Sequence, residues 1–345
     1  MDKHLISRQT TIQEVINHLD KLAVDAILFV IDEKGELIGS VTDGDVRRGL
    51  IHGKKINSSV DQIMNKQPKS LYYHEINCQE VREFRNKNFK IIPLVNKSNQ
   101  IIEILNFRLL KAKLPLDVVI MAGGKGSRLM PITKNLPKPL LKVGSKTMIE
   151  HIIDGLTSFG IKKFDVSINH LGHLIKDALG NGLEKGIQIN FIEETQPLGT
   201  IGSLGLKKNH SNPYTLVLNS DLLTTIDYED YFIDFLIRKA DFSAVGIPYK
   251  VNIPYGIFEM DNDRIKHVNE KPTYTYFSNG GIYLFKTELI DLIPKNQNYL
   301  ATDFIQDLIE INKKVISYSL MDYWLDIGSH SDFERAQKDL KNKSF

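Results

Sequence analysis

Apolar and polar positions follow two different patterns, one in the first third of the chain and one in the remainder. In the first third, two amphipathic helical stretches each begin at a capping signal, Thr11 with Glu14 and Asn77 with Glu80. Each stretch leads into two short apolar runs separated by a polar turn, and a second helical stretch closes each copy. The four predicted strands are residues 26–31, 37–41, 91–95 and 101–105. Units this short can bury their apolar faces only against each other, so we expect a paired α+β module.

The pattern changes near Pro115, which we interpret as a linker mark between domains at 1–113 and 114–345. Beyond it, apolar strands alternate with amphipathic helices, which predicts βαβ units and a mostly parallel sheet in an α/β, Rossmann-like domain. The predicted strands are 117–122, 164–169, 187–193, 214–219 and 242–247, and the helices include 147–159 and 228–240. After Tyr255 the rhythm is that of a hairpin, at 256–260 and 264–269, which we expect to form one wall of a pocket.

Length and charge narrow the class of protein. The chain of 345 residues is long enough for two or so domains, and its formal charge of +2 gives no electrostatic reason to expect nucleic acid or anionic lipid. One cysteine, Cys78, permits neither an internal disulfide nor a cysteine-based metal site. The first residues lack the apolar stretch of a signal peptide, and no apolar window of about 18 residues occurs. We therefore expect a cytoplasmic protein without membrane or nucleic-acid partners.

A glycine-rich loop follows the first strand of the larger part. Gly123, Gly124 and Gly126 allow backbone N–H groups to converge on an anion, and Arg128 adds donors suited to phosphate. The loop lacks the Gly-Lys-Ser/Thr ending of a Walker loop, and Leu129 stands where a dinucleotide fingerprint has its third glycine. Taken alone, such a loop is equally well a tight turn.

The residues that follow favour phosphate chemistry. Lys138 is placed between Pro137 and Pro139, whose stiff backbone presents its ammonium group toward the glycine loop at little entropic cost. The run 122–144 closely resembles the signature of the sugar-1-phosphate nucleotidyltransferases. Further segments similar to that family follow in the expected order, at 197–203, 218–221, 255–256, 270–272, 279–281 and 324–328. This sequence departs from the family pattern at Ile201, where alanine is usual, and at Ser220, where glycine is usual.

The resemblance implies a reaction and a set of site residues. A sugar 1-phosphate would attack the α-phosphorus of a nucleoside triphosphate, releasing pyrophosphate, with Mg²⁺ as cofactor. The implied catalytic residues are Arg128, Lys138, Asp221 and Asp326, of which Asp221 and Asp326 would bind the metal. The implied nucleotide-binding residues are Ala122, Gly123, Gly124, Gly126, Gly199 and Thr200. The implied contacts to sugar and sugar phosphate are Tyr255, Gly256, Glu270, Lys271 and Asn279.

The repeat in the first third resembles a tandem pair of CBS domains, most clearly in residues 39–47. In that family a threonine and an aspartate three residues later bind nucleotide, and Thr42 with Asp45 fits this pattern. The second copy has Asn106 and Leu109 at the corresponding places, so it has lost the carboxylate. We expect the pair either to hold an adenine or guanine nucleotide or to serve only docking and dimerisation, within a homo-oligomer.

The fusion of these two parts resembles the guanylyltransferases that prepare GDP-activated amino sugars for bacterial nonulosonic acids such as legionaminic acid. This resemblance rests on the domain arrangement. It does not rest on any residue that recognises guanine. Mannose-1-phosphate guanylyl transfer and uridylyl or thymidylyl transfer stay open. A catalytically silent nucleotide sensor is the alternative from another class; the intact glycine loop, Lys138, Asp221 and Asp326 argue against it.

Overall fold

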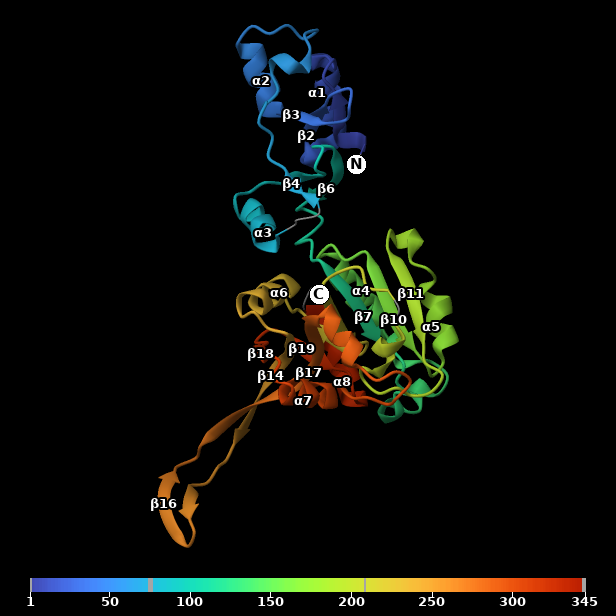
Figure 1. Cartoon of the computed structure of the whole chain (residues 1–345), viewed down its shortest axis with the longest axis vertical. Coiled ribbons are helices and arrows are strands. Elements are labelled where there is room, and N and C mark those ends of the chain that lie inside the picture. The colour runs from blue at the N-terminus through green and yellow to red at the C-terminus, as the bar shows by residue number, and fades with distance from the viewer. Residues whose placement is uncertain (1, 74–76, 208, 343–345) are drawn as a thin grey trace. The chain divides into compact units, whose positions relative to one another are not determined.

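The computed structural model describes residues 2–73, 77–207 and 209–342, and the chain divides into two compact units, Met1–Lys113 and Leu114–Phe345 (Figure 1). The boundary falls directly before the stretch that contains Pro115. Among the described residues, no helix combines the length with the apolar character that a bilayer crossing requires.

The first unit begins with a three-stranded sheet covered by two helices. Its elements are β1 (Leu5–Ser7), α1 (Ile12–Leu22), β2 (Ile27–Ile31), β3 (Leu37–Thr42) and α2 (Asp43–Ile51). β1 runs parallel to β2, which pairs antiparallel with β3. The predicted cap of α1 is confirmed: Thr11 accepts from the backbone N–H of Glu14, and the Glu14 carboxylate accepts from that of Thr11.

The second half of this unit repeats the arrangement. Its elements are β4 (Leu71–Tyr72), α3 (Cys78–Asn86), β5 (Ile91–Val95) and β6 (Ile101–Asn106), with the same strand order and directions as the first copy. The helix expected after β6 is absent from the described residues, where 107–109 form a turn and 110–113 are irregular. Only a few residues separate β6 from the linker, too few to offset the cost of helix nucleation.

The two halves bury apolar faces against each other, as the repeat predicts. Phe29 and Leu37 of the first copy pack with Ile91, Val95 and Ile101 of the second in one cluster. Between the same two halves, Arg108 of the second donates two hydrogen bonds to the carboxylate of the buried Asp25 of the first, at 3.0 and 2.8 Å.

A seven-stranded sheet forms the centre of the second unit, in the order β11, β10, β7, β12, β17, β14, β18. Its strands are β7 (Leu116–Met121), β10 (Lys163–Ile168), β11 (Gln188–Glu193), β12 (Tyr214–Asn219), β14 (Phe242–Asn252), β17 (Thr273–Lys286) and β18 (Val315–Ser319). β11, β10, β7 and β12 are parallel, and β17 is antiparallel to both of its neighbours. The predicted α/β class with a mostly parallel sheet is confirmed.

In the described part of this unit, five α-helices and two small strand pairs surround the sheet. The helices are α4 (Met148–Thr157), α5 (Gly172–Leu179), α6 (Tyr228–Ile237), α7 (Ala301–Glu310) and α8 (His330–Asn342). The strand pairs are β8 (Lys142–Val143) with β9 (Lys146–Thr147), and β13 (Leu222–Thr224) with β19 (Trp324–Asp326). The second of these pairs joins two segments that are about 100 residues apart in sequence; the predicted site residue Asp326 is part of it, and Asp221 directly precedes it.

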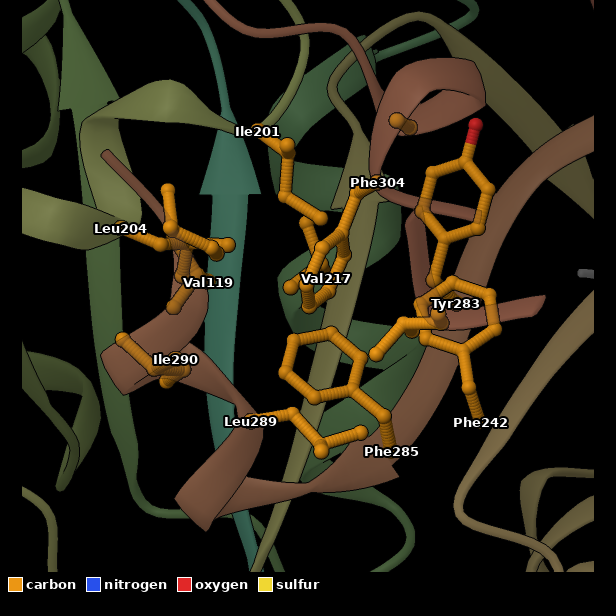
Figure 2. Packing of buried hydrophobic residues seen from close by; sticks show 13 residues of the cluster. Val119, Ile201, Leu204, Val217, Phe242, Tyr283, Phe285, Leu289, Ile290 and Phe304 are labelled. Atoms are coloured by element: carbon orange, nitrogen blue, oxygen red, sulfur yellow. The ribbon is translucent and has the colours of Figure 1, made fainter. Parts of the chain in front are cut away.

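An aromatic core fixes α7 against the sheet (Figure 2). The rings of Phe242 on β14 and Phe285 on β17 are stacked with centroids 5.4 Å apart, and Phe304 of α7 meets both edge-on. Val119 of β7 and Val217 of β12 belong to the same cluster, and both are fully buried. This packing makes the central strands a rigid support for the loops at their carboxyl ends.

β14 and β17 continue beyond the sheet as a two-stranded ribbon. Their pairing is unbroken from Gly246 opposite Asn279 to Asn252 opposite Thr273, and the hairpin of β15 (Ile257–Asp261) and β16 (Arg264–Asn269) completes the projection. We call residues 247–278 the arm; it extends away from the sheet of its unit (Figure 1). The expectation that this hairpin forms a wall of the pocket is wrong, because the continuous ladder carries it outward.

Candidate active site

A cavity of about 520 Å³ lies where the parallel strands end, next to the glycine loop that follows β7. Its lining includes nine of the residues predicted for the site: Gly123, Gly124, Gly126, Arg128, Lys138, Gly199, Thr200, Asp221 and Asp326. A second cavity of about 310 Å³ adjoins it, since Thr200, Asn219 and Asp326 line both. Asn279 lines the second cavity. One hollow with two compartments therefore holds ten predicted residues.

The other predicted residues lie elsewhere. Ala122 is buried at the end of β7, where its N–H donates to the carbonyl of Ser167, and it lines neither cavity. The remaining four, Tyr255, Gly256, Glu270 and Lys271, are exposed on the arm and line neither cavity. Gly256 and Glu270 do meet each other, because a Cβ at Gly256 would lie 2.9 Å from a Glu270 carboxylate oxygen.

Lys138 occupies the centre of the first cavity's charged wall. Pro137 is extended, and Lys138 begins a short 3₁₀ turn whose second residue is Pro139, so the backbone around the lysine is fixed on both sides. The side chain is only 10% exposed; its ammonium group is hydrogen-bonded to Asp221 and lies 3.8 Å from Asp326. A lysine so enclosed is a fixed positive charge inside the cavity.

The two aspartates are held together by the β13–β19 pair. Leu222 is opposite Asp326 in that ladder, and the N–H of Ile327 donates to the carbonyl of Asp221 at 3.0 Å. Each carboxylate has one buried oxygen, Oδ1, that accepts no hydrogen bond. Burial and the nearby Asp221 raise the pKa of Asp326 above its usual value, and Lys138 opposes that rise.

These carboxylates suit a cation that brings other ligands with it. The described residues contain no group of three or more His, Cys, Asp or Glu side chains placed to hold a metal. Two carboxylate oxygens in one wall that accept no hydrogen bond from the described residues match Mg²⁺, which keeps waters and binds through one or two carboxylates together with substrate phosphates.

Two glycines give the cavity its shape. Gly199 has φ of +79°, and a Cβ there would lie 2.6 Å from the carbonyl oxygen of Tyr299. Gly126 has φ of +62° and lies against Thr133 and Lys138. Side chains at either position would therefore move the loop that carries them.

Arg128 and Thr200 are anchored by neighbouring segments. The guanidinium group of Arg128 lies close to Gly328, just beyond β19. The hydroxyl of Thr200 accepts from the N–H of Ala301 at 2.8 Å, at the start of α7. Both predicted residues thus connect the loops to the C-terminal segments.

Sequence reasoning missed Glu194, which follows β11 and lines the first cavity. One carboxylate oxygen accepts from the Ser167 hydroxyl at 2.6 Å, and the other from the N–H of Leu198 at 3.0 Å. A carboxylate has about four acceptor positions, so this fixed group retains capacity for further donors. Its place directly after an apolar strand and shortly before Gly199 was the available signal.

The predicted ligand residues of the first unit form a helix cap. The N–H and hydroxyl of Thr42 donate to one oxygen of Asp45 at 2.8 and 2.7 Å, and Arg48 donates to the other at 2.6 Å. The two residues therefore lie together at the start of α2, where they already stabilise that helix.

Solved structures of similar fold have related architecture. A Bacillus anthracis protein assigned as a glucose-1-phosphate thymidylyltransferase, in complex with a sucrose, is 26% identical with a TM-score of 0.53, covering 67% of this chain and 97% of that one. HddC from Yersinia pseudotuberculosis matches in fold with a TM-score of 0.52 and 24% identity, covering 65% of this chain and 99% of that one.

Similar sequences include mannose-1-phosphate guanyltransferases of fungi. Those of Debaryomyces hansenii and Candida albicans are both 33% identical to this chain, over 227 and 228 residues, or 62% of its length. The matching region also spans 62% of the length of each of these relatives.

Two family models match separate parts of the chain. The model described as CBS domain matches residues 2–52, which contain the first copy of the repeat. The model described as nucleotidyl transferase matches residues 117–343, well over half of the chain and the whole of the cavity wall. The chain belongs to the nucleotidyl transferase family and carries a CBS domain ahead of the family region.

Proposed function

We propose that this chain transfers a nucleotidyl group from a nucleoside triphosphate to a sugar 1-phosphate and releases pyrophosphate. The main support is the arrangement of Lys138, Asp221 and Asp326 in one wall of a cavity that also contains the glycine loop. A cavity with an enclosed cation, two carboxylates and a glycine loop suits the polyphosphate of such a substrate.

In this reaction a phosphate oxygen of the sugar 1-phosphate forms a bond to the α-phosphorus, and the bond from that phosphorus to the leaving pyrophosphate breaks. The attacking oxygen is already an anion, so no side chain has to remove a proton. Arg128 and the amides of Gly123 and Gly124 hold the leaving phosphates, while Lys138 offsets charge at the α-phosphate. When bound, Mg²⁺ held by Asp221 and Asp326 supplies neutralising charge to the phosphate oxygens.

Glu194 supports guanine as the base. The edge of guanine presents two adjacent donors, N1–H and the N2 amino group, and a carboxylate accepts both at once. Uracil and thymine offer a single such donor, flanked by acceptors that a carboxylate repels. Glu194 is held by Ser167 and Leu198 beside Gly199, at the part of the cavity predicted to receive the base. The similarity to mannose-1-phosphate guanyltransferases agrees with this choice.

The sugar would enter the second cavity, where Asn279 lies. Its amide nitrogen donates to the Tyr283 hydroxyl, and its carbonyl accepts from the N–H of Gly281. We propose glucosamine 1-phosphate or a related hexose 1-phosphate, in the service of nonulosonic acids such as legionaminic acid. Mannose 1-phosphate is the main competitor, supported by the named relatives. A cytoplasmic location, where nucleoside triphosphates are available, is part of this proposal.

A matrix assay tests both choices. Pyrophosphate release would be measured with four nucleoside triphosphates against several sugar 1-phosphates, including those of glucosamine, glucose and mannose. We expect turnover with GTP to exceed turnover with the other triphosphates. Equal turnover with UTP or dTTP would contradict the guanine assignment, and no turnover in any combination would contradict the reaction.

For the first unit we propose nucleotide-dependent regulation through Thr42 and Asp45. Because these residues also cap α2, Asp45→Ala removes both functions, and the capping loss alone should lower stability by about 1 kcal/mol. Calorimetry with AMP, ATP and GTP on the full chain separates nucleotide binding from helix capping. Regulation requires AMP or another nucleotide to bind the wild type and to change its turnover; absence of binding would leave the pair a docking or dimerisation module.

A further inference from the structure

The arm, residues 247–278, has an apolar face that no described residue of its own unit covers. In the hairpin, Phe258 lies opposite Val268, and Met260 lies opposite Ile265 across a register shift. These four side chains are 49–56% exposed, whereas the intervening positions carry charged residues. A two-stranded hairpin alone is marginally stable in water, so a covered apolar face is what such a structure needs.

The ribbon that supports the hairpin is also exposed and aromatic. Tyr249 and Tyr276 lie directly opposite each other and are 63% and 61% exposed. Phe277 is exposed on the other face. Altogether the arm offers about 30 residues, which matches the ~20–30 that each partner contributes to a stable interface of standard size.

The second cavity lacks the charge that its proposed substrate requires. None of the described residues that line it is a lysine or an arginine. The cations of the adjoining compartment, Lys125, Arg128 and Lys138, lie on the side of the triphosphate. A sugar phosphate carries close to two negative charges and needs a cation of its own. The described lining of this compartment therefore supplies no cation to the sugar phosphate.

The arm carries the missing cation beyond the reach of its own cavity. The ladder runs six steps from Asn279 to Thr273, and Lys271 is two residues further along, so at ~3.3 Å per residue it lies ~25 Å from the point where the ribbon leaves the sheet. The base of the arm is clamped. β14 stays paired with β18 up to Gly246, which lies opposite Ser319, and a Cβ at Gly246 would lie 2.5 Å from the Ser317 hydroxyl of β18. This packing opposes a swing of the arm back over its own unit.

We propose that the arm of a second copy of this chain docks over the cavity and supplies Lys271 and Glu270 to the sugar phosphate and sugar. A two-fold arrangement covers both arms and completes both sites at once. An unrelated protein would cover the apolar face without using Glu270 and Lys271. A second copy both covers the apolar face of the arm and supplies the cation that the second cavity lacks. This inference rests on the proposed function, because the charge deficit matters only for an anionic substrate.

Complementation between two inactive chains tests this arrangement. Asp221→Asn leaves a defective cavity with an intact arm, and Lys271→Ala leaves an intact cavity with a defective arm. The two chains would be co-expressed with different tags, and the mixed dimer purified through both. We expect each variant alone to lose at least about 100-fold in turnover. The mixed dimer should recover about half of the wild-type rate, since one of its two sites is intact.

A mixed dimer no more active than its parents would show that the arm works within its own chain, and would overturn the inference. Full activity of Lys271→Ala alone would also overturn it. Adding Phe258→Asp to the Asp221→Asn chain should abolish the recovery. Adding Ile237→Asp, a change at a similarly exposed apolar residue of α6 (65% exposed), should not.

The mass in solution separates failure of the inference from failure of the proposed function. By light scattering the wild type should have twice the chain mass of 39.3 kDa, and Phe258→Asp should shift it toward one chain. A wild type of single-chain mass overturns the docking whatever the turnover. A dimer that depends on Phe258 but releases no pyrophosphate with any substrate would preserve the docking and refute the proposed function.

Discussion

The ammonium group of Lys138 is hydrogen-bonded to the carboxylate of Asp221, inside a wall where the side chain of Lys138 is only 10% exposed. Asp326 lies 3.8 Å from the same ammonium group. Lys138 thus neutralises two carboxylates that would otherwise repel each other at close range. Substrate phosphates and a divalent cation would enter between groups that are already positioned, with little rearrangement.

Asp221→Asn should abolish pyrophosphate release while the fold persists. The amide keeps the shape of the carboxylate but removes the negative charge that would bind Mg²⁺, so we expect a loss of about 10²–10³-fold or more in turnover. Asp322→Asn serves as the matched control, because Asp322 is exposed near β19 and lines neither cavity. Wild-type turnover of Asp221→Asn in saturating Mg²⁺ would contradict the metal assignment.

Lys138→Met should have opposite effects on turnover and on metal binding. Without the ammonium group the α-phosphate loses a counter-charge, so turnover should fall about 10²-fold or more. The two carboxylates also lose the cation that now neutralises them. Mg²⁺ without substrate should therefore raise the melting temperature of Lys138→Met more than that of the wild type. An equal Mg²⁺ response in both proteins would show that Lys138 does not compete with the metal.

Glu194→Gln should weaken selection for GTP. The amide presents one acceptor and one donor to guanine where the carboxylate presents acceptors only, which should cost about 1–3 kcal/mol, or 5- to 150-fold in kcat/KM for GTP. The ratio of GTP to UTP turnover is the measurement. Glu193→Gln is the control, since that neighbouring carboxylate pairs with Lys176 and lines neither cavity. An unchanged ratio in Glu194→Gln would remove Glu194 from base recognition.

The sequence predicted those parts of the fold and site that depend on short-range patterns. The glycine loop and Lys138 lie close together along the chain, and the two prolines beside Lys138 indicated that its ammonium group faces the loop. Asp221 and Asp326 are far apart in sequence, and only the family pattern joined them. The β13–β19 ladder is the physical link, and three-residue strands leave almost no periodic signal.

Glu194 and the arm illustrate what local patterns do not contain. Glu194 gains its position from hydrogen bonds to Ser167 on another strand and to Leu198 after a turn, neither of which a sequence displays. The hairpin strands of the arm were predicted correctly, but their direction depends on how far β14 and β17 stay paired. Strand pairing length is a tertiary property, so the placement of Glu270 and Lys271 could not follow from their motif.

Acid should destabilise the first unit through Asp25. Two hydrogen bonds from Arg108 lower the pKa of this buried carboxyl to about 2, below the value near 4 of an unfolded chain. A depressed folded-state pKa adds stability at every pH above about 4, and this contribution disappears as the pH falls from about 4 to 2. Arg108→Ala should remove this contribution at neutral pH and cost about 2–3 kcal/mol, because Asp25 is left buried without its partner.

Urea unfolding of the first unit, followed from pH 7 to pH 2, measures both effects. Lys97→Ala, a change at an exposed residue in the turn after β5, is the control. The Arg108 variant should lose less stability than the wild type between pH 4 and pH 2; parallel pH curves would show that this ion pair does not link the two halves.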